Sequence, residues 1–92
     1  MTEISKEYLI EHGFTSDRPD DALCRFVKSP ADNSYRIMVE HIFRPLDTNL
    51  TWTVDCWNCN EHGAIVRRAN VMYTDSVEDM ETVIKLANID YV

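Results

Sequence analysis

The chain has 92 residues, of which 45% are hydrophobic and 27% charged, a balance that is typical of a globular protein and argues against disorder. Its 16 acidic side chains outnumber the nine basic ones, so the formal net charge is −7. Such a chain repels phosphate backbones and anionic lipid, and we therefore expect no direct nucleic-acid binding and no membrane binding. This length predicts a single domain over residues 1–92.

No apolar run approaches the roughly 20 residues that a membrane-spanning helix needs. Residues 1–13 alternate charged and apolar side chains and lack the apolar segment of a signal peptide. We therefore expect a cytoplasmic protein. Disulfides are rare in reducing compartments, so we expect the cysteines Cys24, Cys56 and Cys59 to be free thiols.

The first predicted element is a short helix over residues 5–12. Residues 8–10 supply its apolar bulk, and Gly13 stands where a glycine commonly ends a helix in the left-handed conformation. The polar, proline-containing segment over residues 15–21 predicts a loop.

Four strand-like runs follow, over residues 22–28, 34–43, 50–58 and 64–73. Turn-forming clusters separate them, and these short connections favour an antiparallel meander. Arg67 and Arg68 blur the alternation of the last run, where a β-bulge could shift the register.

The last predicted element is an amphipathic helix. Ser76 is its expected N-cap, and Asp79 follows at the spacing of a capping box. One apolar stripe runs along it: Val77, Met80, Val83, Ile84 and Ala87. The predicted fold is thus α+β, with a short N-terminal helix, a four-stranded antiparallel meander and a C-terminal helix packed on one sheet face. Its expected core contains Tyr35, Ile37, Val39, Trp52, Val54, Val83 and Ile84.

The second face of the predicted sheet mixes polar and large apolar side chains. By alternation it carries Arg36, Met38 and Trp57, and with simple register in the last strand also Arg68 and Met72. Trp, Met and Arg are enriched at protein interfaces, which makes Arg36, Met38, Trp57 and Arg68 the candidate partner-binding residues. Alternatively, the N-terminal helix packs on this face and makes it a second small core.

Cys56, Cys59 and His62 have the spacing Cys-x-x-Cys-x-x-His, which could bring three ligands to a zinc ion. A fourth ligand would have to come from elsewhere in the chain. Moreover, the two cysteines have opposite strand parity. We keep a zinc-binding module as an alternative and assign no metal or other cofactor.

Other catalytic signals are weak. The two glycines, Gly13 and Gly63, are too far apart for a glycine-rich phosphate loop. Nothing in the sequence pairs a histidine with a cysteine nucleophile. The sequence therefore predicts that the chain is not an enzyme.

The favoured prediction is a small acidic interaction module that binds a protein partner, or itself as a homodimer, through the second sheet face. In its small size, acidity and low glycine content, the chain resembles many short bacterial or phage-encoded proteins. A third hypothesis is therefore a phage-type inhibitor of a host nucleic-acid-binding protein. Its acidic helix would mimic nucleic acid through Glu78, Asp79, Glu81 and Asp90.

Overall fold

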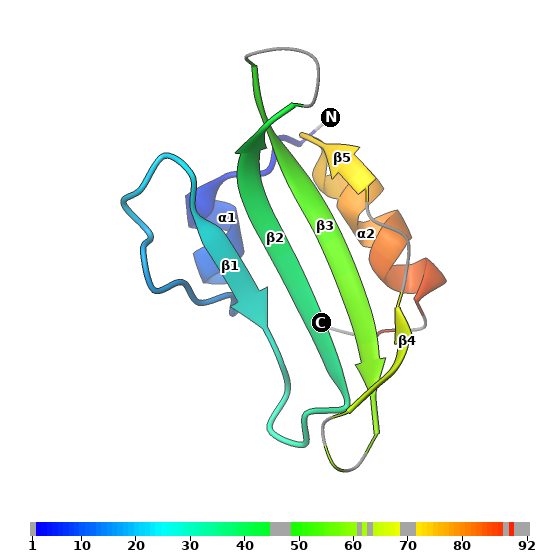
Figure 1. Ribbon diagram of the computed structural model, residues 1–92. Coiled ribbons are helices and arrows are strands. Elements are labelled where there is room, and N and C mark those ends of the chain that lie inside the picture. The colour runs from blue at the N-terminus through cyan, green and yellow to red at the C-terminus, as the bar shows by residue number, and fades with distance from the viewer. Residues whose placement is uncertain are drawn as a thin grey trace.

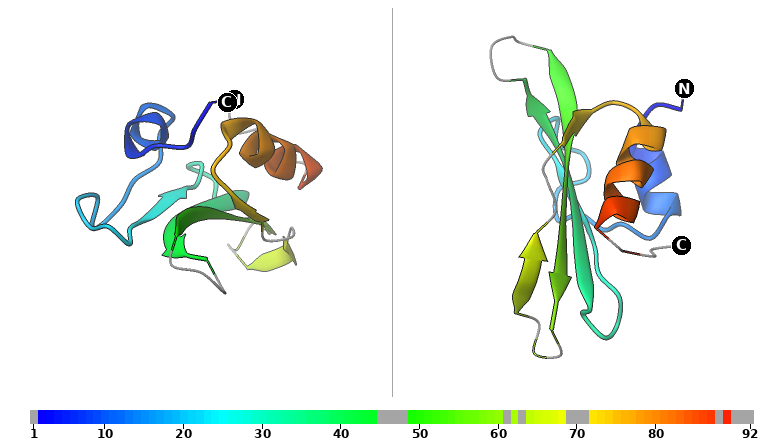
Figure 2. Two further views of the ribbon diagram at one scale, coloured as in Figure 1. Left: turned by 90° about the horizontal axis from the view of Figure 1, so that it is seen from above. Right: turned by 90° about the vertical axis from the view of Figure 1, so that its right-hand side faces the viewer.

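The computed structural model describes residues 2–44, 49–60, 62, 64–68, 72–87 and 89, with 66–68 described as backbone. The elements in chain order are α1 (Lys6–Glu11), β1 (Arg25–Lys28), β2 (Tyr35–Phe43), β3 (Leu50–Cys59), β4 (Ile65–Arg68), β5 (Met72–Thr74) and α2 (Val77–Leu86). The predicted α+β architecture is confirmed, because an antiparallel sheet forms one layer and the helices lie against it (Figures 1 and 2). Within the described ranges, no helix is long and apolar enough to cross a membrane.

The sheet is the expected meander, in the order β1-β2-β3-β4, with β5 as an additional strand that also pairs with β3. The predicted fourth strand over residues 64–73 therefore corresponds to two strands. Asn58 of β3 pairs with Arg67 of β4, but the next residue, Cys59, pairs with Ile65, so the register shifts between them. This is the bulge-like irregularity predicted near Arg67 and Arg68.

This division changes which face Met72 occupies. Arg68 in β4 lies opposite Trp57, whereas Met72 in β5 lies opposite Val54. Trp57 and Val54 are three residues apart on one strand and so point to opposite faces. Met72 packs against the core, and the prediction that it shares a face with Arg68 is wrong.

Both helices lie on the same side of the sheet (Figure 2). Leu9 from α1 and Ile84 from α2 are fully buried and belong to one hydrophobic cluster with Val39 and Val54. Of the predicted core, Ile37, Val39, Trp52, Val54, Val83 and Ile84 are buried, and Tyr35 is partly buried against them. The alternative in which the N-terminal helix covers the second sheet face is wrong.

Helix α1 ends at the predicted glycine. Gly13 has φ of 85°, which is the left-handed conformation that glycine adopts without steric cost. The Phe14 N–H donates to the Leu9 carbonyl at 2.9 Å, and the Gly13 N–H donates to the Ile10 carbonyl at 3.1 Å. These two bonds form a Schellman motif, which turns the chain so that Phe14 enters the core.

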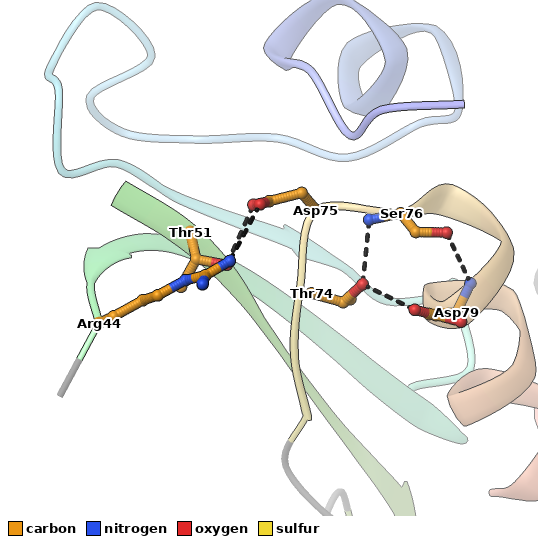
Figure 3. A network of polar contacts seen from close by, with 6 residues as sticks. All are labelled: Arg44, Thr51, Thr74, Asp75, Ser76 and Asp79. Atoms are coloured by element: carbon orange, nitrogen blue, oxygen red, sulfur yellow. Dashed lines mark hydrogen bonds and ion pairs between the residues drawn. The ribbon is translucent and has the colours of Figure 1, made fainter. Parts of the chain in front are cut away.

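Helix α2 begins at Ser76, as predicted. The Ser76 hydroxyl accepts the Asp79 N–H at 3.3 Å, satisfying one of the free donors of the first turn (Figure 3). Thr74 joins this cap, because its hydroxyl accepts the Ser76 N–H at 3.0 Å and donates to the Asp79 carboxylate at 3.1 Å.

The residue between them, Asp75, ties the start of α2 to the sheet. Its carboxylate accepts the Thr51 hydroxyl at 3.0 Å and lies 3.4 Å from the Arg44 guanidinium (Figure 3). Its backbone carbonyl accepts the Ile4 N–H at 2.8 Å. The junction between β5 and α2 is therefore fixed from β3 and from the N-terminal segment.

Glu78 makes the stability of this junction sensitive to pH. Its pKa is lowered from 4.5 to about 2, because its carboxylate accepts its own backbone N–H and that of Thr2. The folded state therefore holds this proton less tightly than the unfolded chain. The resulting stabilisation is complete above about pH 4.5 and is lost as the pH falls toward 2.

We expect Glu78→Gln to lower the free energy of unfolding at pH 7 and to weaken its pH dependence between 4.5 and 2. Urea denaturation at a series of pH values measures both effects. The control is Glu11→Gln, at an exposed position with no hydrogen-bond partner among the described residues. Equal effects of the two substitutions would contradict a specific role for the bond between Thr2 and Glu78.

Candidate protein-interaction face

The sheet face turned away from both helices, called the open face below, is covered by neither of them (Figure 2). Strand alternation and register assign its residues, which form short rows across the strands. They are Arg25 and Val27 of β1; Arg36, Met38, Glu40 and Ile42 of β2; Thr51, Thr53, Asp55 and Trp57 of β3; Arg68 of β4; and Tyr73 of β5.

One row brings together three of the four predicted partner-binding residues. Trp57 is the Cα partner of Arg36 on β2 and of Arg68 on β4, so a tryptophan position lies between two arginine positions. The Trp57 side chain is half-buried and that of Arg36 is exposed. Arg36 makes no ion pair or hydrogen bond with the described residues, so its guanidinium group is available to a partner.

Met38, the fourth predicted residue, lies in the next row. It is half-buried between Val27 of β1 and Asp55 of β3, which are its Cα partners. The row after that contains Arg25 and Glu40, which form an ion pair at 3.3 Å. The open face therefore carries an arginine-bearing end, a row in which Val27 and Met38 lie beside the buried Asp55, and then a pair of balanced charges.

The side chains of the central strand β3 have little exposure on this face. Thr51 is fully buried and Thr53 is 9% exposed, although no helix covers them. The Thr51 hydroxyl donates to the Asp75 carboxylate at 3.0 Å, whereas Tyr73, opposite Thr53, is 51% exposed. A partner would therefore contact mainly the long side chains at the flanks.

A hollow of about 460 Å³ extends the open face past the edge of β1. Its lining includes Val27, Ile42 and Leu23, the last of which is 52% exposed. Its far wall is the segment over residues 15–18, held in place because Thr15 and Val27 exchange two backbone hydrogen bonds of 2.9 Å. This hollow was missed in the sequence, where the polar loop after α1 carries no signal of a concave surface.

Cys56, Cys59 and His62 do not lie together as the ligands of one zinc ion would. Cys56 is fully buried in the core, and burial raises the pKa of its thiol to about 12. Cys59 is half-buried three residues further along β3, about 10 Å away at the usual rise of a strand, and His62 is exposed. No group of three or more His, Cys, Asp or Glu in the described part of the chain is placed to hold a metal ion. The zinc hypothesis gains no support from this placement.

Three of the acidic residues of the inhibitor hypothesis belong to α2, on the helix side of the sheet. Glu78 and Asp79 are exposed at the start of α2, while Glu81 is half-buried and accepts the Tyr8 hydroxyl at 3.4 Å. Asp90 lies outside the described residues. The exposed Glu7 and Glu11 of α1 belong to the same layer as α2, so acidic side chains of both helices share it.

Comparison with known proteins adds no assignment to these surfaces. No family model matches the chain, and no curated protein or solved structure matches it either. The case for the open face therefore rests on its geometry, with Arg36, Met38 and Trp57 placed by their side chains and Arg68 by its register.

The three thiols should differ in reactivity. We expect iodoacetamide at pH 8 to alkylate native protein at Cys59, while Cys24 and Cys56, at 2% and 0% exposure and with raised thiol pKa values, stay protected. Peptide mass spectrometry locates the label, and labelling in 6 M guanidinium chloride is the control in which all three react. Rapid native labelling of Cys56 would contradict its placement in the core.

Proposed function

We propose that the chain is a protein-interaction module that binds a protein partner through the open face. The observation that carries this proposal is that both helices pack on one side of the sheet and leave Arg36, Met38 and Trp57 on the other. Arg, Met and Trp are the residue types that interface cores concentrate. The proposal assigns no catalytic residue, in keeping with the prediction that the chain is not an enzyme.

A different protein is a better occupant of this face than a second copy of the chain. Each copy carries a net charge of −7, and self-repulsion of this size opposes homodimer formation at low ionic strength. A homodimer is therefore the alternative outcome, to be recognised by light scattering. In either case the open face is the contact surface, and the helix layer remains exposed.

The test compares single substitutions on the two sides of the molecule. Met38→Glu and Trp57→Ala alter the open face. Leu86→Glu is the control for Met38→Glu, because it places the same negative charge on α2, at a residue that is 71% exposed. We expect the first two variants to lose about tenfold or more in binding, as substitutions at interface hot spots do, and Leu86→Glu to bind normally. Quantitative affinity capture measures partner binding, light scattering measures self-association, and circular dichroism confirms that each variant folds.

Equal capture by all three variants, together with a monomeric wild type, would contradict the proposal. The acidic helix layer supplies the competing explanation, because Glu7 and Glu11 of α1 lie on the same side as Glu78 and Asp79 of α2. A partner that the open-face variants retain, but that a Glu7→Lys, Glu11→Lys double variant loses, would favour the inhibitor hypothesis instead. Such binding would also weaken steeply with salt.

A further inference from the structure

The charges of this acidic chain are distributed unevenly between its two sides. The helices carry five acidic residues, Glu7, Glu11, Glu78, Asp79 and Glu81, against the two lysines Lys6 and Lys85. The open face, in contrast, has arginine positions in three of its strands, at Arg25, Arg36 and Arg68. The same face also carries Glu40 and Asp55, so the charges of its described side chains balance, and a partner region of negative charge meets less repulsion here than elsewhere on a chain of charge −7.

The arginines whose side chains are described are not equally available on the sheet. Arg18 is exposed and makes no ion pair with the described residues, but it belongs to the loop that lines the hollow and not to a strand. Arg25 is paired with Glu40 at 3.3 Å, and Arg44 is paired with Asp75 at 3.4 Å. Arg36 is exposed and has no such carboxylate among the described residues. A free guanidinium group binds a carboxylate through two parallel hydrogen bonds, so Arg36 is the position at which an acidic group of a partner is best accommodated.

The aliphatic part of the open face begins one row away. Met38 and Val27 are Cα partners and are both half-buried, and Met38 is two residues from Arg36 along β2. Two residues of a strand span about 7 Å, which is also the spacing of side chains i and i+2 in an extended peptide. Val27 also lines the hollow beside β1, where Leu23 and Ile42 are the other aliphatic residues among a mainly polar lining.

We propose that the partner presents an extended acidic and aliphatic segment to the open face. Its carboxylate lies against Arg36 in the row that contains Trp57, and an aliphatic side chain two residues further along packs on Met38 and Val27. This inference rests on the proposed function and adds to it the chemistry of the partner. Charge complementarity with Arg36 sets the orientation of the segment, and the aliphatic contact supplies desolvation.

The experiment uses the acetylated and amidated peptide Ser-Ser-Glu-Ser-Leu-Ser-Ser, with two matched peptides in which lysine replaces glutamate or serine replaces leucine. Amide chemical shifts of the whole protein report binding and locate it. We expect saturable binding of the glutamate peptide on the open face, and about tenfold weaker binding of the lysine peptide or of the glutamate peptide to Arg36→Glu. Lys85→Glu, the same charge change at an exposed position of α2, should bind like the wild type.

Binding of the glutamate peptide should also weaken as salt is raised from about 0.05 to 0.3 M, because the pair at Arg36 is exposed to solvent. The inference is overturned if the glutamate and lysine peptides bind equally, if Arg36→Glu binds like the wild type, or if the glutamate peptide fails to bind. Shifts on the open face with a ten-residue oligothymidine but not with the peptide would overturn it in favour of nucleic acid. If Met38→Glu still abolishes partner capture in any of these cases, the proposed function stands and only the chemistry assigned to the partner fails.

Discussion

The antiparallel bridge between Glu3 and Ser76 determines how the rest of the molecule is arranged. In this bridge the Ile4 N–H donates to the Asp75 carbonyl, and the Val77 N–H donates to the Thr2 carbonyl, both at 2.8 Å. Each chain segment enters a helix within three residues of the bridge, α1 at Lys6 and α2 at Val77. The two helices must therefore begin side by side, and they share one face of the sheet.

A one-sided core follows from this arrangement. The row formed by Phe26, Val39, Val54 and Met72 crosses four strands on the helix side, and all its members belong to the core or pack against it. Burying these side chains under α1 and α2 supplies the main stabilisation of the fold. The other face then has to be compatible with solvent while the protein is free. The exposed Arg25, Arg36 and Tyr73 meet this requirement, since they place polar groups between the half-buried apolar side chains of this face.

Local patterns in the sequence were sufficient for the elements that periodicity defines. The alternation of β2 and β3 and the apolar stripe of α2 predicted both the elements and their buried faces, and the parity of Arg36, Met38 and Trp57 placed them on the open face. Two features depended on contacts between distant residues and were not predictable. The face of Met72 depends on the register of β5 against β3, and the side taken by α1 depends on the bridge to Ser76, which lies 73 positions after Glu3. The apolar residues of α1 would have fitted either face of the sheet.

The one-sided core does not include the residues of the proposed contact surface. Substitutions at Arg36, Met38 and Trp57 leave the helix-side cluster intact, because none of these residues belongs to it. Changes in binding at these positions can therefore be interpreted without a large correction for unfolding. Glu78 behaves in the opposite way, since it is exposed but supports the junction that positions both helices. An exposed acidic residue of the helix layer can thus affect the whole fold, whereas Arg36 on the open face is exposed and makes no ion pair with the described residues.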